Sequence, residues 1–147
     1  MTRAYLAFTE KGLALAQKLA SALPGTVARC GHGGPGLADW AAEQFAHADA
    51  LIFVGAVGIA VRAIAPHCRS KAVDPAVVVL DECGHFAVPI LSGHLGGAND
   101  LARALAAVCG AVPVITTATD ANGVFAVDAW ARHQNCAVLE PERIKRV

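Results

Sequence analysis

Two short runs in which every residue is apolar, ALIFV at 50–54 and AVVVL at 76–80, constrain the fold more than any other feature. A strand with one face in water alternates apolar and polar residues, whereas an unbroken apolar run is typical of a strand covered on both faces. These runs alternate with helical periodicity along most of the chain, which is the pattern of an α/β sheet. We expect strands at 3–8, 26–30, 50–54, 76–80, 86–91, 112–116 and 136–140, and helices at 10–22, 37–48, 58–64, 98–108 and 124–133.

The stretch AVVVLDECGHFAVPIL predicts a hairpin, because two apolar runs flank a short turn that contains Gly84. Hairpin strands are antiparallel, so an otherwise parallel sheet would be mixed at this point. The predicted fold class is α/β: a three-layer sandwich whose sheet is mostly parallel, or mixed at the hairpin, with helices on both faces. We expect a single domain over residues 1–147, because this length suits one hydrophobic core.

Composition excludes several classes of protein. Hydrophobic residues make up 55% of the chain and charged residues 16%, which argues against intrinsic disorder. The 12 basic and 12 acidic residues cancel, so the chain carries no electrostatic footprint for nucleic acid. No uncharged apolar run reaches the roughly 18 residues that span a bilayer, and Glu10 and Lys11 come too early for a signal peptide. We therefore expect a cytoplasmic protein whose cysteines serve mainly as small core residues.

Three loops that each follow a predicted strand and precede a predicted helix carry the candidate functional residues. They are GAVG at 55–58, SGHLGGAND at 92–100 and TTATDANG at 116–123. If their strands run parallel, the loops line one edge of the sheet, where ligands of α/β proteins bind. Helix N-termini offer unpaired N–H groups, and glycines allow close approach to the backbone. The loops therefore predict a site for an anionic ligand.

Individual side chains in or near these loops have competing interpretations. Arg62 and Lys71 could pair with carboxylates, or they could be ordinary solvated surface residues. His94 is placed to act as a general acid or base, or to brace its loop. Ser92 is better explained as a ligand contact or helix cap than as a nucleophile, because the G-x-S-x-G motif is absent. Asp120 is a catalytic candidate, with an Asx-turn as the alternative.

Some motifs point to chemistry less strongly. GHGGPG at 31–36 matches the dinucleotide-binding pattern literally, but it falls in the second strand–helix unit and carries a proline where the helix should begin. The tripeptide CGH occurs at 30–32 and at 83–85, but C-x-H is not a usual zinc spacing. Asp81 and Glu82 in the hairpin, and Asp74 before Pro75, can be explained as turn formers. We therefore expect neither a nucleotide site nor a metal site.

Three ordered segments, GIAVRAIAP, K..DPAVVVLDE.G and LSGHLGGAN, make the chain resemble the CbiG family of cobalamin-biosynthesis proteins. The likeness extends from AYLAFTEKGLALAQKLA to the end of the chain. It covers the family's α/β N-terminal region and the start of its middle region. We expect the family's separate C-terminal domain to be absent from this chain and to be supplied by a longer chain or a second polypeptide.

The resemblance implies a cobalt-precorrin-5A hydrolase of vitamin B12 biosynthesis, which opens the ring-A lactone and releases acetaldehyde. Cobalt would arrive in the tetrapyrrole substrate, so neither a cofactor nor a protein metal site is expected. Partners would be that substrate and a C-terminal domain or other pathway enzymes, with a homodimer left open. The alternatives are a non-catalytic corrinoid-binding module and a nucleotide-binding α/β domain. The expected site residues are His94 and Asp120 for catalysis, and Gly55, Gly58, Arg62, Lys71, Ser92, Gly93, Gly96, Gly97, Asn99 and Thr117 for substrate binding.

Overall fold

The computed structural model describes residues 1–93 and 96–118 of the chain. The chain divides into two units, Met1–Val114 and Ile115–Val147, and residues 115–118 are the described part of the second. The predicted helix at 124–133 and strand at 136–140 lie outside the described residues. The expectation of one domain over 1–147 therefore stays a prediction.

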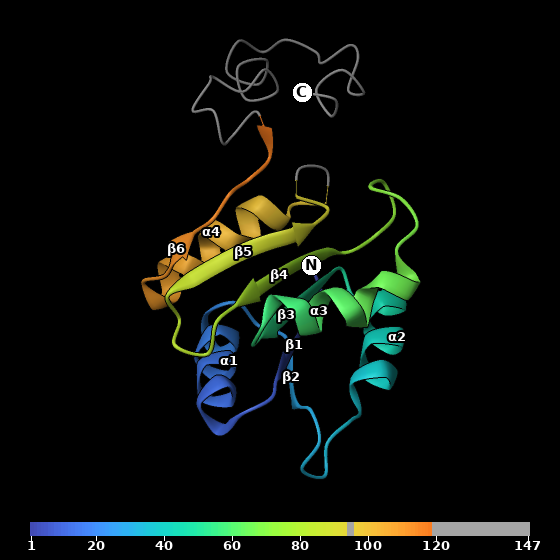
Figure 1. The fold of residues 1–147 in the computed structure, drawn as a ribbon. Coiled ribbons are helices and arrows are strands. Elements are labelled where there is room, and N and C mark those ends of the chain that lie inside the picture. The colour runs from blue at the N-terminus through green and yellow to red at the C-terminus, as the bar shows by residue number, and fades with distance from the viewer. Residues whose placement is uncertain (94–95, 119–147) are drawn as a thin grey trace. The chain divides into compact units, whose positions relative to one another are not determined.

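The first unit is built on a six-stranded sheet in the order β2-β1-β3-β4-β5-β6 (Figure 1). Strands β1 to β4 are mutually parallel, β5 runs antiparallel to β4, and β6 is parallel to β5. The predicted α/β class is confirmed, and the hairpin makes the sheet mixed. The strands are β1 (Arg3–Ala7), β2 (Thr26–Arg29), β3 (Ala50–Val54), β4 (Ala76–Leu80), β5 (Phe86–Leu91) and β6 (Val112–Pro113).

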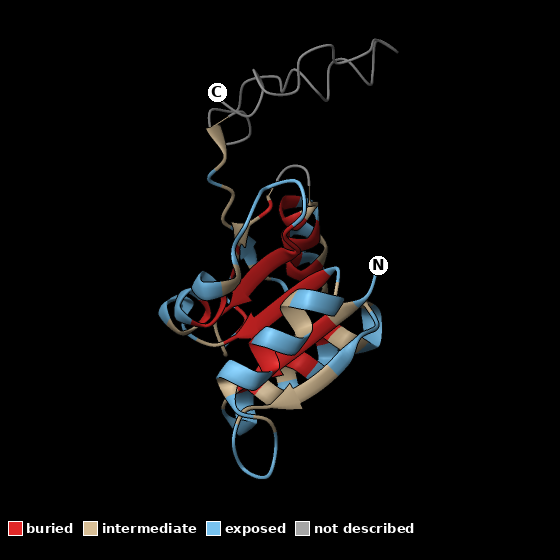
Figure 2. Cartoon of the chain, turned by 90° about the vertical axis from the view of Figure 1, so that its right-hand side faces the viewer, coloured by how far each residue is buried: buried red, intermediate tan, exposed pale blue. Residues whose placement is uncertain are grey.

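Helices cover both faces of this sheet, which explains its unbroken apolar strands. Helices α1 (Glu10–Ala22) and α4 (Ala98–Cys109) pack together against one face, and α2 (Leu37–His47) and α3 (Val57–Ile64) pack together against the other. A 3₁₀ turn, η1 (Ala65–His67), follows α3. Figure 2 shows β3 and β4 as buried strands between helices whose outer surfaces are exposed.

The helix boundaries follow from local chemistry. Thr9 precedes α1 in an extended conformation, and its hydroxyl accepts the Gly12 N–H at 3.0 Å, as an N-cap does. Gly110 ends α4 with a φ of +78°, a left-handed conformation that costs glycine little. Both signals are readable in the sequence, which is why the predicted limits of these helices lie within a residue of the observed ones.

The central strands supply the core. Every residue of β3 and β4 is buried, and Phe53 packs edge-to-face against Trp40 of α2 with ring centroids 5.3 Å apart. Full burial of a side chain such as Phe53 stabilises the fold by about 1.5–3 kcal/mol. β2 is only partly buried because it is an edge strand. Within the part of the chain described, no helix is both long and apolar enough to cross a membrane.

Candidate functional site

The reversal at the hairpin separates two of the predicted loops. β3 and β4 end at the same edge, where the Gly55 N–H donates to the Leu80 carbonyl at 2.8 Å. β5 runs back, so that Leu91 pairs with Val77 near the start of β4. Residues 55–58 therefore lie at the opposite edge of the sheet from residues 92–93 and 96–97, and the expectation that both loops line one edge is wrong. Apolar runs reveal strands but not their direction.

The remaining candidates are placed as follows. Gly58 and Arg62 are in α3, which begins at the edge where β3 ends. Thr117 belongs to the second unit. His94 and Asp120 lie outside the described residues, so their catalytic roles stay predictions.

A buried hydrogen bond joins two segments that the sequence analysis singled out separately. The Ser92 hydroxyl donates to the Asp74 carbonyl at 3.0 Å, and the two residues are 9% and 8% exposed. The Asp74 carboxylate in turn accepts the backbone N–H of Arg69, at 2.9 and 3.1 Å, and that of Ser70 at 3.2 Å. We call this arrangement the Ser92–Asp74 junction. It brings Asp74 of the segment KAVDP and Ser92 of the segment LSGHLGGAN to one edge, although the two residues are 18 positions apart.

Backbone geometry at the junction explains its small residues. A Cβ added to Gly96 would lie 2.4 Å from Ser92 Cβ and 2.8 Å from the Ser92 carbonyl oxygen, so only glycine fits without displacement. Ser92 itself has a φ of +56°, which a residue with a side chain adopts at a cost. The junction therefore holds a strained residue in place, as functional loops often do.

The N-terminus of α4 is partly satisfied from within the loop. The Ala98 N–H donates to the Ser92 carbonyl at 3.1 Å, and the Asn99 N–H donates to the Gly93 carbonyl at 2.9 Å. Two of the amides expected to be unpaired at a helix N-terminus are thus already bonded. The expected anion binding by this terminus must come from its remaining donors and its dipole, not from these two amides.

Two adjoining hollows open beside the junction. One has a volume of about 430 Å³ and includes Asp74 and Gly96 in its lining, and the other has a volume of about 320 Å³ and includes Asp74 and Arg69. The end of α2, residues 45–47, lines the first hollow, and Phe45 and Ala46 line both. These volumes are within the range of ligand pockets in general. The hollows make the edge where β5 ends the candidate functional site.

Basic side chains line the second hollow or lie in the segments next to its lining residues, whereas the first hollow is lined by Asp49 and Asp74 and, among the described residues, by no lysine or arginine. His67 and Arg69 line the second hollow, exposed Lys71 is in the same loop, and exposed Arg62 is in the last turn of α3. Within residues 1–93 and 96–118, no ion pair engages Arg62, Arg69 or Lys71. Arg62 and Lys71 are candidates from the sequence, whereas His67 and Arg69 are not among the residues expected there. In the segment PHCRSK, Arg69 stands two positions before Lys71. Like Lys71, Arg69 could pair with a carboxylate, so the sequence also indicated this residue.

Two ionisable groups near the hollows have shifted pKa values. Hydrogen bonds from the backbone and hydroxyl of Thr2, at 2.8 and 3.0 Å, lower the pKa of Asp49, which lines the first hollow. Burial raises the pKa of the Cys68 thiol, with the nearby Asp74 carboxylate acting in the same direction. Asp49 is therefore a carboxylate at neutral pH, and Cys68 is a thiol with little tendency to ionise.

The opposite edge gives structural explanations for two other motifs. A Cβ on Gly55 would lie 2.9 Å from the Phe8 ring, so this glycine is required for packing. In GHGGPG, the Gly31 N–H donates to the Pro35 carbonyl and the Gly34 N–H to the Gly31 carbonyl, at 3.1 and 2.7 Å. These amides close the turn on itself and are not directed at a phosphate. The structure therefore gives no support to a dinucleotide site in this loop.

Comparisons with known proteins agree with the segments identified above. The family model described as "Cobalamin synthesis G N-terminal" matches residues 39–120. The chain is 47% identical over 149 residues to the cobalt-precorrin-5A hydrolase of Salmonella typhimurium, covering 93% of this chain and 41% of that protein. It is 48% identical over 82 residues to the cobalt-precorrin-5A hydrolase of Priestia megaterium, covering 56% of this chain and 22% of that protein. The chain thus spans less than half the length of these relatives.

A solved structure supports the fold independently. A crystal structure described as that of a cobalamin biosynthesis protein G homolog from Sulfolobus solfataricus aligns with 99% of this chain and 44% of that chain, with a TM-score of 0.66. Sequence identity in this alignment is 24%, so the likeness bears on the fold alone.

Proposed function

The chain belongs to the cobalamin synthesis G N-terminal family, and from this premise we propose that it forms part of a cobalt-precorrin-5A hydrolase. The reaction opens the ring-A lactone of a cobalt-containing tetrapyrrole and releases acetaldehyde, within vitamin B12 biosynthesis in the cytoplasm. Cobalt enters as part of the substrate. The remaining part of the enzyme would come from a C-terminal domain on the same or a second polypeptide.

The Ser92–Asp74 junction is the observation that carries this proposal. It joins two of the segments that resemble the family and sets them beside the hollows. A precorrin is a large ring bearing many carboxylates, so hollows of about 430 and 320 Å³ suit one edge of the ring and not the whole. Arg62, Arg69 and Lys71 would pair with peripheral carboxylates, most strongly where an arginine binds in a bidentate manner.

Opening of the lactone requires three functions at the site, and carbon–carbon bonds must break in addition for the C20 meso carbon and its methyl group to leave as acetaldehyde. Water must be activated to attack the carbonyl carbon, the developing oxyanion needs donors, and the departing ring oxygen needs a proton. We assign proton transfer to His94, with Asp120 as a second catalytic group, and oxyanion stabilisation to backbone amides among residues 93–97. Because the Ser92 hydroxyl donates to the Asp74 carbonyl in a buried position, Ser92 acts as a positioning residue and not as the nucleophile.

A non-catalytic corrinoid-binding module is the second candidate. The observation that favours it is coverage: the chain spans 41% of the Salmonella typhimurium relative, so groups essential for chemistry can reside in the remainder. In that case the hollows would bind one edge of the macrocycle and the bond-breaking groups would come from elsewhere.

Measurement of acetaldehyde release from cobalt-precorrin-5A separates these candidates. The assay is run with the chain alone and with the C-terminal region of a longer family member added. Acetaldehyde in either arm, lost in His94→Ala and retained in the control His32→Ala, supports the hydrolase. Tight binding without acetaldehyde in both arms supports the binding module. Turnover by His94→Ala at the rate of the unsubstituted chain would remove His94 from the mechanism.

A further inference from the structure

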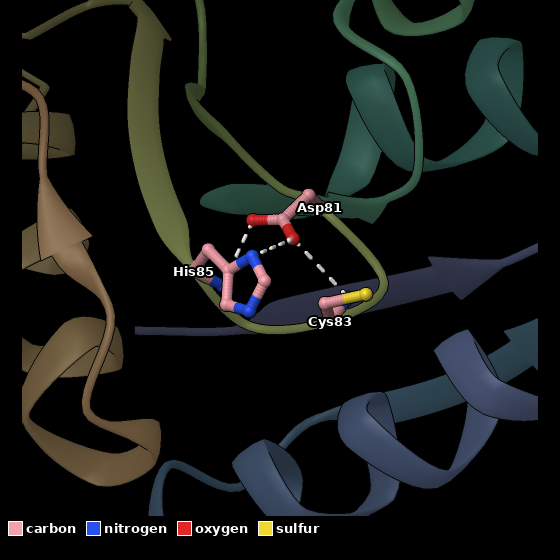
Figure 3. A group of neighbouring side chains, drawn as sticks. All are labelled: Asp81, Cys83 and His85. Atoms are coloured by element: carbon pink, nitrogen blue, oxygen red, sulfur yellow. Dashed lines mark hydrogen bonds and ion pairs between the residues drawn. The ribbon is translucent and has the colours of Figure 1, made fainter.

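The turn between β4 and β5 gathers three side chains that ligate metals. Asp81, Cys83 and His85 stand at alternate positions of a five-residue segment, and Figure 3 shows the three side chains gathered at this turn. The Asp81 carboxylate accepts the backbone N–H groups of Cys83, His85 and Phe86 at 3.2, 2.9 and 2.7 Å. This confirms Asp81 as a turn former, and it also fixes the carboxylate inside the turn.

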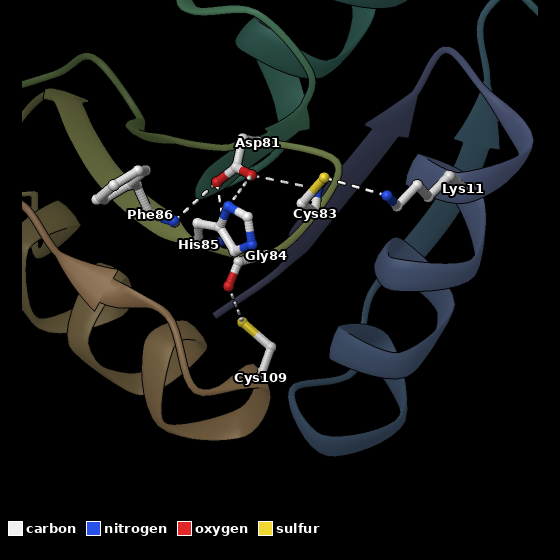
Figure 4. Close-up of polar contacts among 7 residues, drawn as sticks. All are labelled: Lys11, Asp81, Cys83, Gly84, His85, Phe86 and Cys109. Atoms are coloured by element: carbon white, nitrogen blue, oxygen red, sulfur yellow. Dashed lines mark hydrogen bonds and ion pairs between the residues drawn. The ribbon is translucent and has the colours of Figure 1, made fainter.

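The conformation of Gly84 also shapes the turn. Gly84 has a φ of +71°, its N–H donates to the Asp81 carbonyl at 2.9 Å, and its carbonyl faces the Cys109 thiol at the end of α4 (Figure 4). The backbone that carries the three side chains is therefore preorganised. A site built on a fixed backbone loses less entropy when a ligand orders its side chains.

The donor atoms are close enough to bind one ion. One ligand atom from each of Asp81, Cys83 and His85 lies within 4.8 Å of the others, and His85 Nδ1 is 3.8 Å from Asp81 Oδ2. Bonds of about 2.0–2.3 Å to tetrahedral zinc place ligand atoms about 3.3–3.8 Å apart. Contraction by up to about 1.5 Å is needed, and Cys83 and His85 are exposed, so their side chains have room to rotate.

We propose that Asp81, Cys83 and His85 bind a divalent transition-metal ion of the zinc type through a carboxylate oxygen, a thiolate and an imidazole nitrogen. Mixed oxygen, sulfur and nitrogen donors in tetrahedral geometry favour such ions over Mg²⁺ or Ca²⁺. Three protein ligands leave a fourth position for water or another ligand, as in open zinc sites. This proposal replaces the expectation of no metal site and does not depend on the proposed hydrolase function.

Lys11 is the competitor that the metal must displace. Its ammonium donates to Cys83 Sγ at 3.1 Å, and this hydrogen bond raises the pKa of Lys11 (Figure 4). The side chain is exposed and flexible, so it can leave the sulfur when an ion binds.

The chain provides its own matched control in the second CGH tripeptide. Residues 30–32 repeat the sequence of residues 83–85, but Ala28 stands where Asp81 stands two positions before the cysteine. Among the described residues, Cys30 and His32 belong to no group of three potential ligands. A site that depends on the Asp81 carboxylate should therefore form at 81–85 and not at 28–32.

Titration of the reduced, metal-free chain with Co²⁺ tests the proposal, because a cobalt–thiolate bond gives a charge-transfer band in the near ultraviolet. We expect one equivalent of Co²⁺ to develop the band and Zn²⁺ to abolish it. Cys83→Ser should remove the band, His85→Ala should weaken Co²⁺ binding by at least about tenfold, and Cys30→Ser should leave both unchanged. Circular dichroism checks that each variant is folded. Absence of the band in the unsubstituted chain, or its persistence in folded Cys83→Ser, would overturn the proposal.

Discussion

Replacing Ser92 with alanine removes the hydroxyl that joins β5 to the loop before β4. The bond to the Asp74 carbonyl is 3.0 Å long and buried, so water cannot readily replace the lost donor. A neutral hydrogen bond contributes about 0.5–1.5 kcal/mol, and a buried acceptor left without a partner costs about 1–3 kcal/mol. We expect Ser92→Ala to lower the free energy of unfolding by about 1–3 kcal/mol, which corresponds to a fall in Tm of roughly 4–12 °C.

Ser92→Gly separates the hydroxyl from the backbone strain. Both variants lose the same hydrogen bond, but glycine adopts the φ of +56° at this position without steric cost. Ser92→Gly should therefore be more stable than Ser92→Ala by about 1 kcal/mol.

Urea denaturation followed by circular dichroism measures both differences. Equal stability of Ser92→Ala and the unsubstituted chain would refute the role assigned to the hydrogen bond. Equal stability of the alanine and glycine variants would refute the role assigned to backbone strain.

Four further predictions address packing, binding and pH. Gly96→Ala should lower the free energy of unfolding by about 1–3 kcal/mol, because the added Cβ would overlap the Cβ of Ser92. A Cβ added to Gly58 in α3 would have no atom within 4 Å, so Gly58→Ala should raise the free energy of unfolding by about 0.5–1 kcal/mol. A lower free energy of unfolding for this variant would contradict the packing argument. In absorbance titrations with cobalt-precorrin-5A, Lys71→Ala should weaken binding by about two- to fivefold, and exposed Lys18→Ala should not; equal losses would argue against a local contact. Because the folded-state pKa of Asp49 is lowered from its ordinary 3.8, its contribution is present above that pH and lost as pH falls through the folded value. The Tm difference between the unsubstituted chain and Asp49→Ala should therefore disappear in acid, and a difference independent of pH would contradict this explanation.

Local signals in the sequence were sufficient for most of the secondary structure. The runs at 76–80 and 86–91 are observed as β4 and β5 with the predicted limits, and α1 is observed over the predicted 10–22. Each depends on residues close in the chain: an apolar run, a capping hydroxyl, a glycine after the last turn. The mixed sheet also followed from the hairpin, since a short connection permits only antiparallel neighbours.

The location of the candidate site required information that is not local. The hairpin was predicted, but its consequence for residues 92–97 depends on which end of β5 meets which end of β4. The Ser92–Asp74 junction joins residues 18 positions apart, and no short pattern signals such a bond. Gly55, Gly58 and Ser92 all follow predicted strands, but the direction of the strands places Gly55 and Gly58 at the other edge.

The three proposed metal ligands in the hairpin turn show a different limit of prediction from the sequence. The CGH repeat is visible in the sequence, but the spacing of its cysteine and histidine is unusual for a zinc site. The role of turn former is a sufficient explanation of Asp81 in the sequence. In the structure one carboxylate serves both purposes, because accepting three backbone N–H groups holds it near Cys83 and His85. A pattern that assigns each residue a single role misses such a group.

Amide hydrogen exchange with and without cobalt-precorrin-5A tests the central claim most directly, that the substrate binds at the edge where β5 ends. Mass spectrometry of peptides reports exchange at both edges of the sheet in one experiment. We predict slower exchange on binding in peptides covering 68–75 and 92–99, with no change in peptides covering 28–36 and 81–86. Slowing confined to 55–58 or 81–86 would place the substrate at the opposite edge and contradict the account.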